Sequence, residues 1–215
     1  MTIPVFYSIS DDFTKYAAVS LNSLVKNASP QNDYTVTFLN QDLSEKHQKQ
    51  LAAFANDYVH VKFFHIDEKL VKPIQNRIEN YLRADFFKIS IFYLLFIPDL
   101  FQQYDKAIYI DSDTVVVDDI AKLYNNDLYN KLFAACTDSS IQYVDKMVKY
   151  IKEVLALDPK KYINSGMLVL NSKAFRDEHF IDHFMHLLER YHFDCIAPDQ
   201  DYLNEIDDGR ILHLD

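Results

Sequence analysis

The sequence predicts an α/β protein built on a mostly parallel sheet flanked by helices. Short apolar runs rich in Val, Ile, Phe and Tyr alternate with amphipathic segments, the order that produces a parallel sheet with crossover helices. The chain has 215 residues, 49% of them hydrophobic, with no internal repeat and no Pro- or Gly-rich linker. This length and composition suit one packed core, so we expect a single domain over residues 1–215.

The expected strands are short apolar runs bounded by polar or turn residues, because strands buried in a parallel sheet have this composition. In chain order they are Ile3–Ile9, Tyr34–Leu39, Val59–Ile66, Ala107–Ile110, Val115–Val117, Phe133–Cys136, Met167–Leu170 and Ile211–Leu214. Ligands of such sheets bind beyond the carboxyl ends of the strands. The residues that follow these strands are therefore the first candidates for a functional site.

The expected helices lie between the strands and carry apolar residues at helical spacing. Tyr16–Lys26 places Leu21 and Leu24 on one face, and Ser44 is a suitable N-cap for the helix that follows the second strand. Further helices are expected at Asp85–Ile97, which ends at Pro98, at Ile141–Leu157 and at Ala174–Tyr191. Each would cover one face of the sheet.

Charge and composition exclude several kinds of partner. A net charge of −10 argues against nucleic acids and anionic membranes, which bind clustered Lys and Arg. No apolar run approaches the roughly 20 residues that span a bilayer, and the N-terminus has no secretory signal. Cys136 and Cys195 lie in apolar surroundings and suggest no disulfide framework. We therefore expect a cytoplasmic protein.

Aspartates follow three of the expected strands. Asp11 and Asp12 follow the first strand, Asp111 and Asp113 come directly after the strand that ends at Ile110, and Asp138 follows Phe133–Cys136. Because residues two apart on an extended chain point the same way, Asp111 and Asp113 can reach one Mg²⁺ or Mn²⁺ ion. About 3 Asp-x-Asp pairs are expected by chance among 25 Asp in 215 residues, so the buried strand beside this pair carries the argument. The plain alternative is a solvated strand end.

Four segments in the right order resemble glycosyltransferase family 8. "DKAIYIDSDTVVVDDI" is similar to the Asp-x-Asp segment of that family, and "VFYSISDDFTKYAAVSLNSL" to its N-terminal nucleotide-binding strand, loop and helix. "YINSGMLVLN" and "DQDYLN" resemble two further family segments. The resemblance implies a GT-A-type nucleotide-sugar-binding fold. It also implies a retaining transfer of a hexose, galactose or glucose, from a UDP-sugar to a saccharide or lipooligosaccharide acceptor, as in lipopolysaccharide biosynthesis.

The same resemblance implies a role for each matching residue. Asp111 and Asp113 would bind Mn²⁺ or Mg²⁺, and Asp199 and Gln200 would lie beside the reacting carbon of the sugar. The nucleotide would be bound by Ser8, Ser10, Asp11, Asp12, Phe13 and Ser112, with the Phe13 ring stacked on the base. Asp138 and Asn164 would face the sugars.

This sequence also departs from the family pattern. Leu94 stands where the family commonly has an arginine that contacts the donor sugar. The family's third metal ligand is a histidine in a later segment, which would also offer peripheral membrane contact, whereas His213 here comes too early. We therefore expect a donor-binding and catalytic domain that lacks the C-terminal segment of the family.

Three other interpretations stay open at this stage. A haloacid-dehalogenase-like phosphatase also has an apolar strand followed by Asp-x-Asp, and Asp111 would then be its nucleophile. The departures above would also suit a nucleotide-sugar-binding protein without catalysis. His179, His183 and His186 share one helical face, as zinc ligands would, although an exposed histidine stripe is the simpler interpretation.

Overall fold

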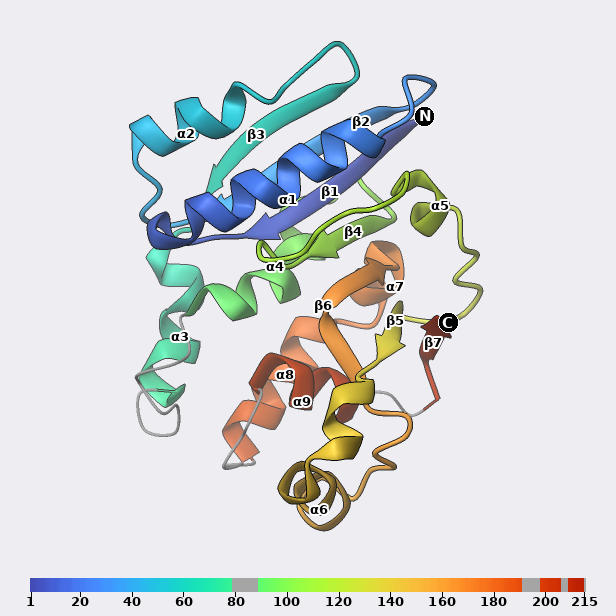
Figure 1. Ribbon diagram of the computed structural model, residues 1–215. Helices are drawn as coiled ribbons and strands as arrows, with labels where there is room; N and C mark the ends of the chain where they lie inside the picture. The colour runs from blue at the N-terminus through green and yellow to red at the C-terminus, as the bar shows by residue number, and fades with distance from the viewer. Residues whose placement is uncertain (79–88, 191–197, 206–208, 215) are drawn as a thin grey trace.

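The computed structural model describes residues 1–78, 89–190, 198–205 and 209–214. These residues form a seven-stranded sheet in the order β3-β2-β1-β4-β6-β5-β7, with helices on both faces (Figure 1). Strand β6 runs antiparallel to its neighbours β4 and β5, and the other strand pairs in the sheet are parallel. The predicted α/β architecture with a mostly parallel sheet is confirmed.

The strands fall close to their predicted positions with two exceptions: β6 begins at Ile163 rather than at the predicted Met167, and the predicted strand at Val115–Val117 is described below. They are β1 Thr2–Ser8, β2 Asp33–Asn40, β3 Val59–His65, β4 Ala107–Ile110, β5 Phe133–Thr137, β6 Ile163–Leu170 and β7 Ile211–Leu214. Alternate residues of each strand face opposite sides of the sheet, so Val5 and Tyr7 enter one core while Phe6 enters the other.

The helices connect the strands across both faces. They are α1 Thr14–Asn27, α2 Glu45–Ala52, α3 Glu68–Ile78, α4 Tyr93–Leu100, α5 Ala121–Tyr124, α6 Asp145–Glu153, α7 Ser172–Asp177, α8 Phe180–Arg190 and α9 Pro198–Glu205, with 3-10 turns η1 Asp11–Phe13, η2 Ile89–Phe92 and η3 Ser139–Tyr143. Ser44 caps α2 as predicted, because its side chain accepts a hydrogen bond from the His47 amide. No helix in the described ranges is long and apolar enough to cross a membrane.

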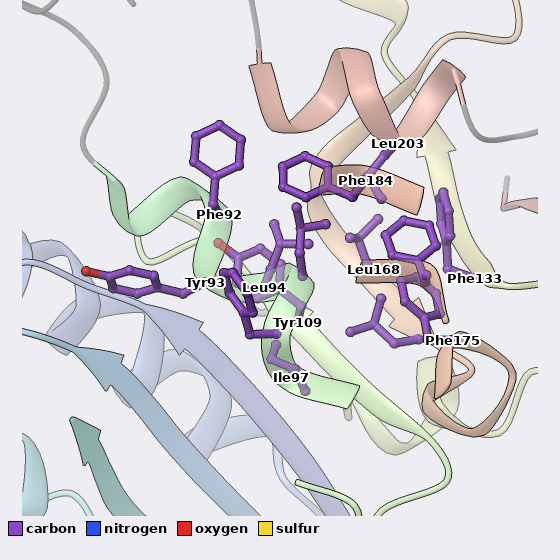
Figure 2. Close-up of a cluster of buried hydrophobic side chains, with 14 of the residues drawn as sticks. Phe92, Tyr93, Leu94, Ile97, Tyr109, Phe133, Leu168, Phe175, Phe184 and Leu203 are labelled. Atoms are coloured by element: carbon purple, nitrogen blue, oxygen red, sulfur yellow. The ribbon is translucent and has the colours of Figure 1, made fainter. Parts of the chain in front are cut away.

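Two hydrophobic cores hold the helices on the sheet. On one face, α1 and α2 pack their apolar sides against β1, β2 and β3. On the other face, α4, α7, α8 and α9 surround Tyr109 and Leu168 from the sheet (Figure 2). Leu94 lies within this second core and is only 2% exposed, so its side chain packs against apolar neighbours.

The predicted strand at Val115–Val117 is wrong. This segment pairs with no strand in the described part of the chain, and Val115 and Val117 are 61% and 82% exposed. It runs along α1 instead, where the Val116 amide donates to Ser23 Oγ at 2.8 Å and Asn27 Nδ2 donates to the Val116 carbonyl at 3.0 Å. Side chains of α1 thus satisfy the backbone groups that a neighbouring strand would otherwise bind.

The boundaries of the helices were predicted less accurately than those of the strands. Helix α4 continues through Pro98 to Leu100 rather than stopping there, and the Phe101 amide still reaches the Ile97 carbonyl at 3.0 Å. The part of the predicted helix before residue 89 lies outside the described residues. The predicted helix at 174–191 is two helices, because His179 adopts a φ of 51° between α7 and α8.

Two further differences concern helix length and number. The predicted helix at 141–157 is shorter, since η3 and α6 divide that segment and α6 ends at Glu153. Helices α3, α5 and α9 were not predicted.

Candidate active site

The site forms at one edge of the sheet because β6 runs against the other strands. The carboxyl ends of β1, β4 and β5 lie at this edge, and the reversed β6 begins there. The Asp111 amide donates to the Gly166 carbonyl at 2.8 Å, and the Asp138 amide donates to the Tyr162 carbonyl at 2.8 Å. These contacts bring the residues after β4 and β5 against the start of β6, where Asn164 lies.

Asp111 is a largely buried carboxylate held in one orientation. Its Oδ1 accepts a hydrogen bond from the Tyr109 hydroxyl at 2.7 Å, and Tyr109 itself is 2% exposed. Burial raises the pKa of Asp111, the Tyr109 hydrogen bond lowers it, and the nearby charge of Asp113 raises it again. The net result is a raised pKa, which marks a site with surplus negative charge.

Gly166 is required beside Asp111 because there is no room for a side chain. A Cβ atom at position 166 would lie 2.8 Å from Asp111 Oδ2 and 2.9 Å from Asn164 Oδ1. The Gly166 amide meanwhile donates to Asn164 Oδ1 at 2.9 Å, which fixes the Asn164 side chain. Two side chains of the site, Asp111 and Asn164, therefore approach the backbone at Gly166.

Asp138, Asn164 and Gln200 form a polar cluster beside Asp111. Gln200 Nε2 donates to Asp138 Oδ2 at 3.3 Å, and Asn164 Nδ2 lies 3.5 Å from the same oxygen. Ser140 donates to Asp138 Oδ1 through its hydroxyl at 2.6 Å. Burial alone would raise the pKa of Asp138, but the hydrogen bonds from Ser140, Gln200 and Asn164 outweigh it and the pKa is lowered. Asp138 is therefore held as a carboxylate.

Gln200 and Asp199 begin helix α9 and face the start of β6. Gln200 is 7% exposed, and its Oε1 accepts from the Ser165 amide at 3.1 Å. Burial raises the pKa of Asp199 to about 7, a hydrogen bond from Ser165 opposes the rise, and the Asp111 charge adds to it. Two predicted catalytic residues and a predicted metal ligand thus belong to one electrostatic cluster.

The first loop lies between β1 and α1, at the same edge of the sheet. Ser10 is buried, whereas Asp12 and Phe13 are exposed and the Phe13 ring lies 5.6 Å from the Tyr16 ring. The Ser8 hydroxyl is buried at the end of β1, next to the Tyr109 hydroxyl on β4.

Asp11 faces helix α2 rather than the polar cluster. Its Oδ1 accepts from the Ser44 amide at 2.8 Å and lies 2.7 Å from His47 Nδ1. The Ser44 and His47 hydrogen bonds lower the pKa of Asp11. Its predicted contact with a nucleotide is untested, but this carboxylate has a structural role in joining the loop to α2.

Asp113, Ser112 and the histidines are the remaining residues that the sequence singled out. Asp113 is exposed, and Ser112 beside it is 7% exposed. In the part of the chain that the structure describes, no group of three His, Cys, Asp or Glu side chains is arranged to hold a metal ion. His213 on β7 lies 3.5 Å from Thr137 Oγ1, and the predicted histidine stripe on and before α8 is exposed.

Four residues that line or support the site were not predicted. They are Tyr109, Ser165, Asp201 and Asn204. Tyr109 lies two residues before Asp111, which directly follows strand β4, so strand periodicity could have placed both side chains on the same side. Asn204 binds the Ile163 backbone through its amide group, with Oδ1 accepting from the Ile163 amide at 2.8 Å and Nδ2 donating to the Ile163 carbonyl at 3.2 Å.

The mixed sheet and its polar edge define a GT-A-type α/β fold, and solved structures share it. The bifunctional glycosyltransferase WbbM matches with a TM-score of 0.79 and 26% identity over 99% of this chain and 38% of its own. The galactosyltransferase LgtC matches with a TM-score of 0.83 and 20% identity over 99% of this chain and 73% of its own.

The chain belongs to glycosyl transferase family 8, whose family model matches residues 4–215. A Haemophilus influenzae relative, named as a candidate glycosyltransferase, is 24% identical over 214 residues, which is 99% of this chain and 62% of the relative. Glycosyltransferase GlyB of Streptococcus pneumoniae is 28% identical over 168 residues, which is 78% of this chain and 35% of GlyB. This chain therefore spans less than two thirds of the length of these relatives.

Proposed function

We propose that this chain is the donor-binding and catalytic domain of a retaining glycosyltransferase that moves a hexose from a UDP-sugar to a saccharide acceptor. The observation that carries the proposal is the junction of β4 and β6. There the largely buried carboxylate of Asp111 lies against Gly166 and Asn164 and close to Asp199. A cluster of this kind suits a ligand that brings both a cation and sugar hydroxyl groups.

The chemistry of the two aspartates fits a hard divalent cation. Mg²⁺ and Mn²⁺ prefer oxygen ligands, and they are often bound by one or two carboxylates together with substrate phosphates. Asp111 and Asp113 would hold the ion, and Asp111 carries the surplus negative charge that a cation relieves. Mn²⁺ or Mg²⁺ bound there would neutralise the diphosphate as it leaves the sugar.

The nucleotide would lie along the first loop. The buried Ser8 hydroxyl and the buried Ser10 offer polar contacts at the end of β1. The exposed Phe13 ring can stack on the base. Ser112 and Asp12 line the same edge in this proposal, and Asp11 holds the loop against α2.

The sugar would be bound by the polar cluster of Asp138, Asn164 and Gln200. Amide and carboxylate groups in fixed orientations can bind several hydroxyl groups at once. In the Gln200 side chain, Oε1 accepts a hydrogen bond from the Ser165 amide and Nε2 donates one to Asp138. This arrangement supports a role for Gln200 in orienting Asp138 and the sugar. Asp199, with a pKa of about 7, can bind a hydroxyl group as donor or acceptor.

The acceptor and the cellular location remain parts of the proposal. We infer an oligosaccharide or lipooligosaccharide acceptor from the family, since LgtC was solved with donor and acceptor sugar analogues. The cytoplasm is the proposed location, as the sequence led us to expect.

Turnover assays separate this function from phosphatase chemistry. We expect slow, Mn²⁺-dependent release of UDP from UDP-galactose or UDP-glucose, lost in Asp111→Asn, and no hydrolysis of para-nitrophenyl phosphate. A phosphatase with Asp111 as nucleophile would hydrolyse the aryl phosphate and be inhibited by beryllium fluoride. Asp111-dependent hydrolysis of the aryl phosphate would replace our proposal with the phosphatase.

A further inference from the structure

A second carboxylate, deeper than the site itself, lies directly after Gln200. Asp201 is 1% exposed, and its Oδ2 accepts a hydrogen bond from the Tyr150 hydroxyl at 2.8 Å. Its Oδ1 accepts a hydrogen bond from the Tyr162 hydroxyl. A buried carboxylate is unfavourable unless its oxygens are bound, so these two tyrosines stabilise it there.

The two tyrosines come from different parts of the fold. Tyr150 belongs to α6, and Tyr162 precedes β6 and is 1% exposed within the small core beneath α6. Burial, followed by the charge of Asp201, raises the pKa of Tyr162, which keeps its hydroxyl protonated as a donor. Asp201 therefore joins α6, the start of β6 and α9 at one point.

The same helix face binds the backbone of β6. Asn204 lies about one turn after Gln200 in α9, and its Nδ2 donates to the Gln200 backbone carbonyl at 2.8 Å. The same Asn204 side chain binds the backbone amide and the backbone carbonyl of Ile163. Gln200 in turn binds Ser165 and Asp138. The position of Gln200 relative to the sugar-facing residues thus depends on the seating of α9 on β6.

We propose that Asp201 is a positioning residue that seats α9 on β6, and so holds Gln200 against Ser165 and Asp138. The seating is a property of the ligand-free fold, whereas its consequence for sugar binding rests on the function proposed above. Asp201 itself is shielded by Tyr150 and Tyr162 and acts through Gln200.

Amide hydrogen exchange by NMR tests the seating without any ligand. The Ser165 and Ile163 amides donate to Gln200 and Asn204, so their exchange reports directly on α9. In Tyr150→Phe, which removes one hydroxyl and keeps the ring, we expect both amides to exchange about tenfold faster, as loss of a hydrogen bond to a charged group implies. Tyr143→Phe is the matched control, because Tyr143 is 89% exposed beside the same helix.

Amide exchange in the half of the sheet far from α9 distinguishes a local loosening of α9 from a loss of stability of the whole protein. The Ile9 amide, which donates to the Leu39 carbonyl, should exchange at the wild-type rate in both variants. Asp201→Asn, which retains an acceptor oxygen, should show a smaller increase at Ser165 than Asp201→Ala. Unchanged exchange at Ser165 and Ile163 in Tyr150→Phe, or an equal increase at Ile9, would overturn the inference.

Calorimetry then links the seating to the sugar. We expect Tyr150→Phe to bind UDP with wild-type affinity. The ratio of its affinity for UDP-galactose to its affinity for UDP should be at least about threefold lower than in the wild type. If wild-type protein fails to bind UDP, the proposed function is wrong while the exchange result still decides the role of Asp201. If UDP-galactose keeps its full advantage in Tyr150→Phe, Asp201 does not position the sugar-facing residues.

Discussion

Asp199 offers the clearest quantitative prediction, because its carboxyl group is destabilised when charged. Burial and the neighbouring Asp111 charge raise its pKa from 3.8 to about 7, against the opposing Ser165 hydrogen bond. The substitution Asp199→Asn keeps the size of the side chain and removes its titration. We expect the variant to gain stability relative to the wild type as the pH rises.

The sign follows from proton binding in the two states. Between pH 3.8 and about 7 the unfolded chain has lost the Asp199 proton while the folded chain keeps it, so wild-type stability falls as the pH rises. The interval is about 3 pH units, and each unit corresponds to about 1.36 kcal/mol, which gives roughly 4 kcal/mol across the whole window. The stability contribution is complete below pH 3.8 and is lost above about pH 7.

Urea denaturation in EDTA measures this difference. The free energy of unfolding of Asp199→Asn minus that of the wild type should rise between about pH 4 and pH 8 and then level off. The difference cancels the titrating groups that do not interact with Asp199. A difference that stays constant across this range would refute the assignment of a raised pKa to Asp199.

Three further predictions concern the neighbours of the site. Gly166→Ala places a Cβ 2.8 Å from Asp111 Oδ2, so we expect a loss of about 1–3 kcal/mol in urea denaturation, and an unchanged midpoint would contradict the close contact. Tyr109→Phe removes a hydrogen bond that lowers the pKa of Asp111, so calorimetry should show that Mn²⁺-dependent UDP binding is weakened increasingly as the pH is lowered. A loss that is the same at every pH would argue against this role of Tyr109. Asp11→Asn weakens the contact with α2 and should lower the melting temperature at pH 7. Because the pKa of Asp11 lies below 3.8, this drop in melting temperature should shrink below pH 3.8. No drop at pH 7 would show that the contact is not stabilising.

The sequence was sufficient to predict the sheet and the edge that carries the site. Apolar runs predicted β1 to β7 closely, because buried strands need continuous apolar residues. The aspartates after β4 and β5 were predicted to meet because ligands of such sheets bind beyond the carboxyl ends of the strands. Asn164 joined them through the family resemblance, since the reversal of β6 that places it there is not evident in the apolar pattern.

Other features depend on contacts between distant residues and left little signal in the sequence. Val115–Val117 has the composition of a strand, but polar side chains of α1 hold its backbone. Asp201 and Tyr162 are 39 residues apart in sequence, so neither residue indicates the other. The break at His179 occurs without a glycine or proline, the residues that usually mark such a break.

Isothermal titration of UDP in Mn²⁺ and in EDTA tests the central claim most directly, namely that Asp111 and Asp113 bind a divalent cation together with the diphosphate. We predict that EDTA weakens UDP binding by at least about tenfold, since a charge-assisted contact to phosphate is worth about 1.5–3 kcal/mol. Asp111→Asn should bind UDP weakly and with little dependence on Mn²⁺. Equal affinity for UDP in Mn²⁺ and EDTA, or full affinity in Asp111→Asn, would contradict the claim.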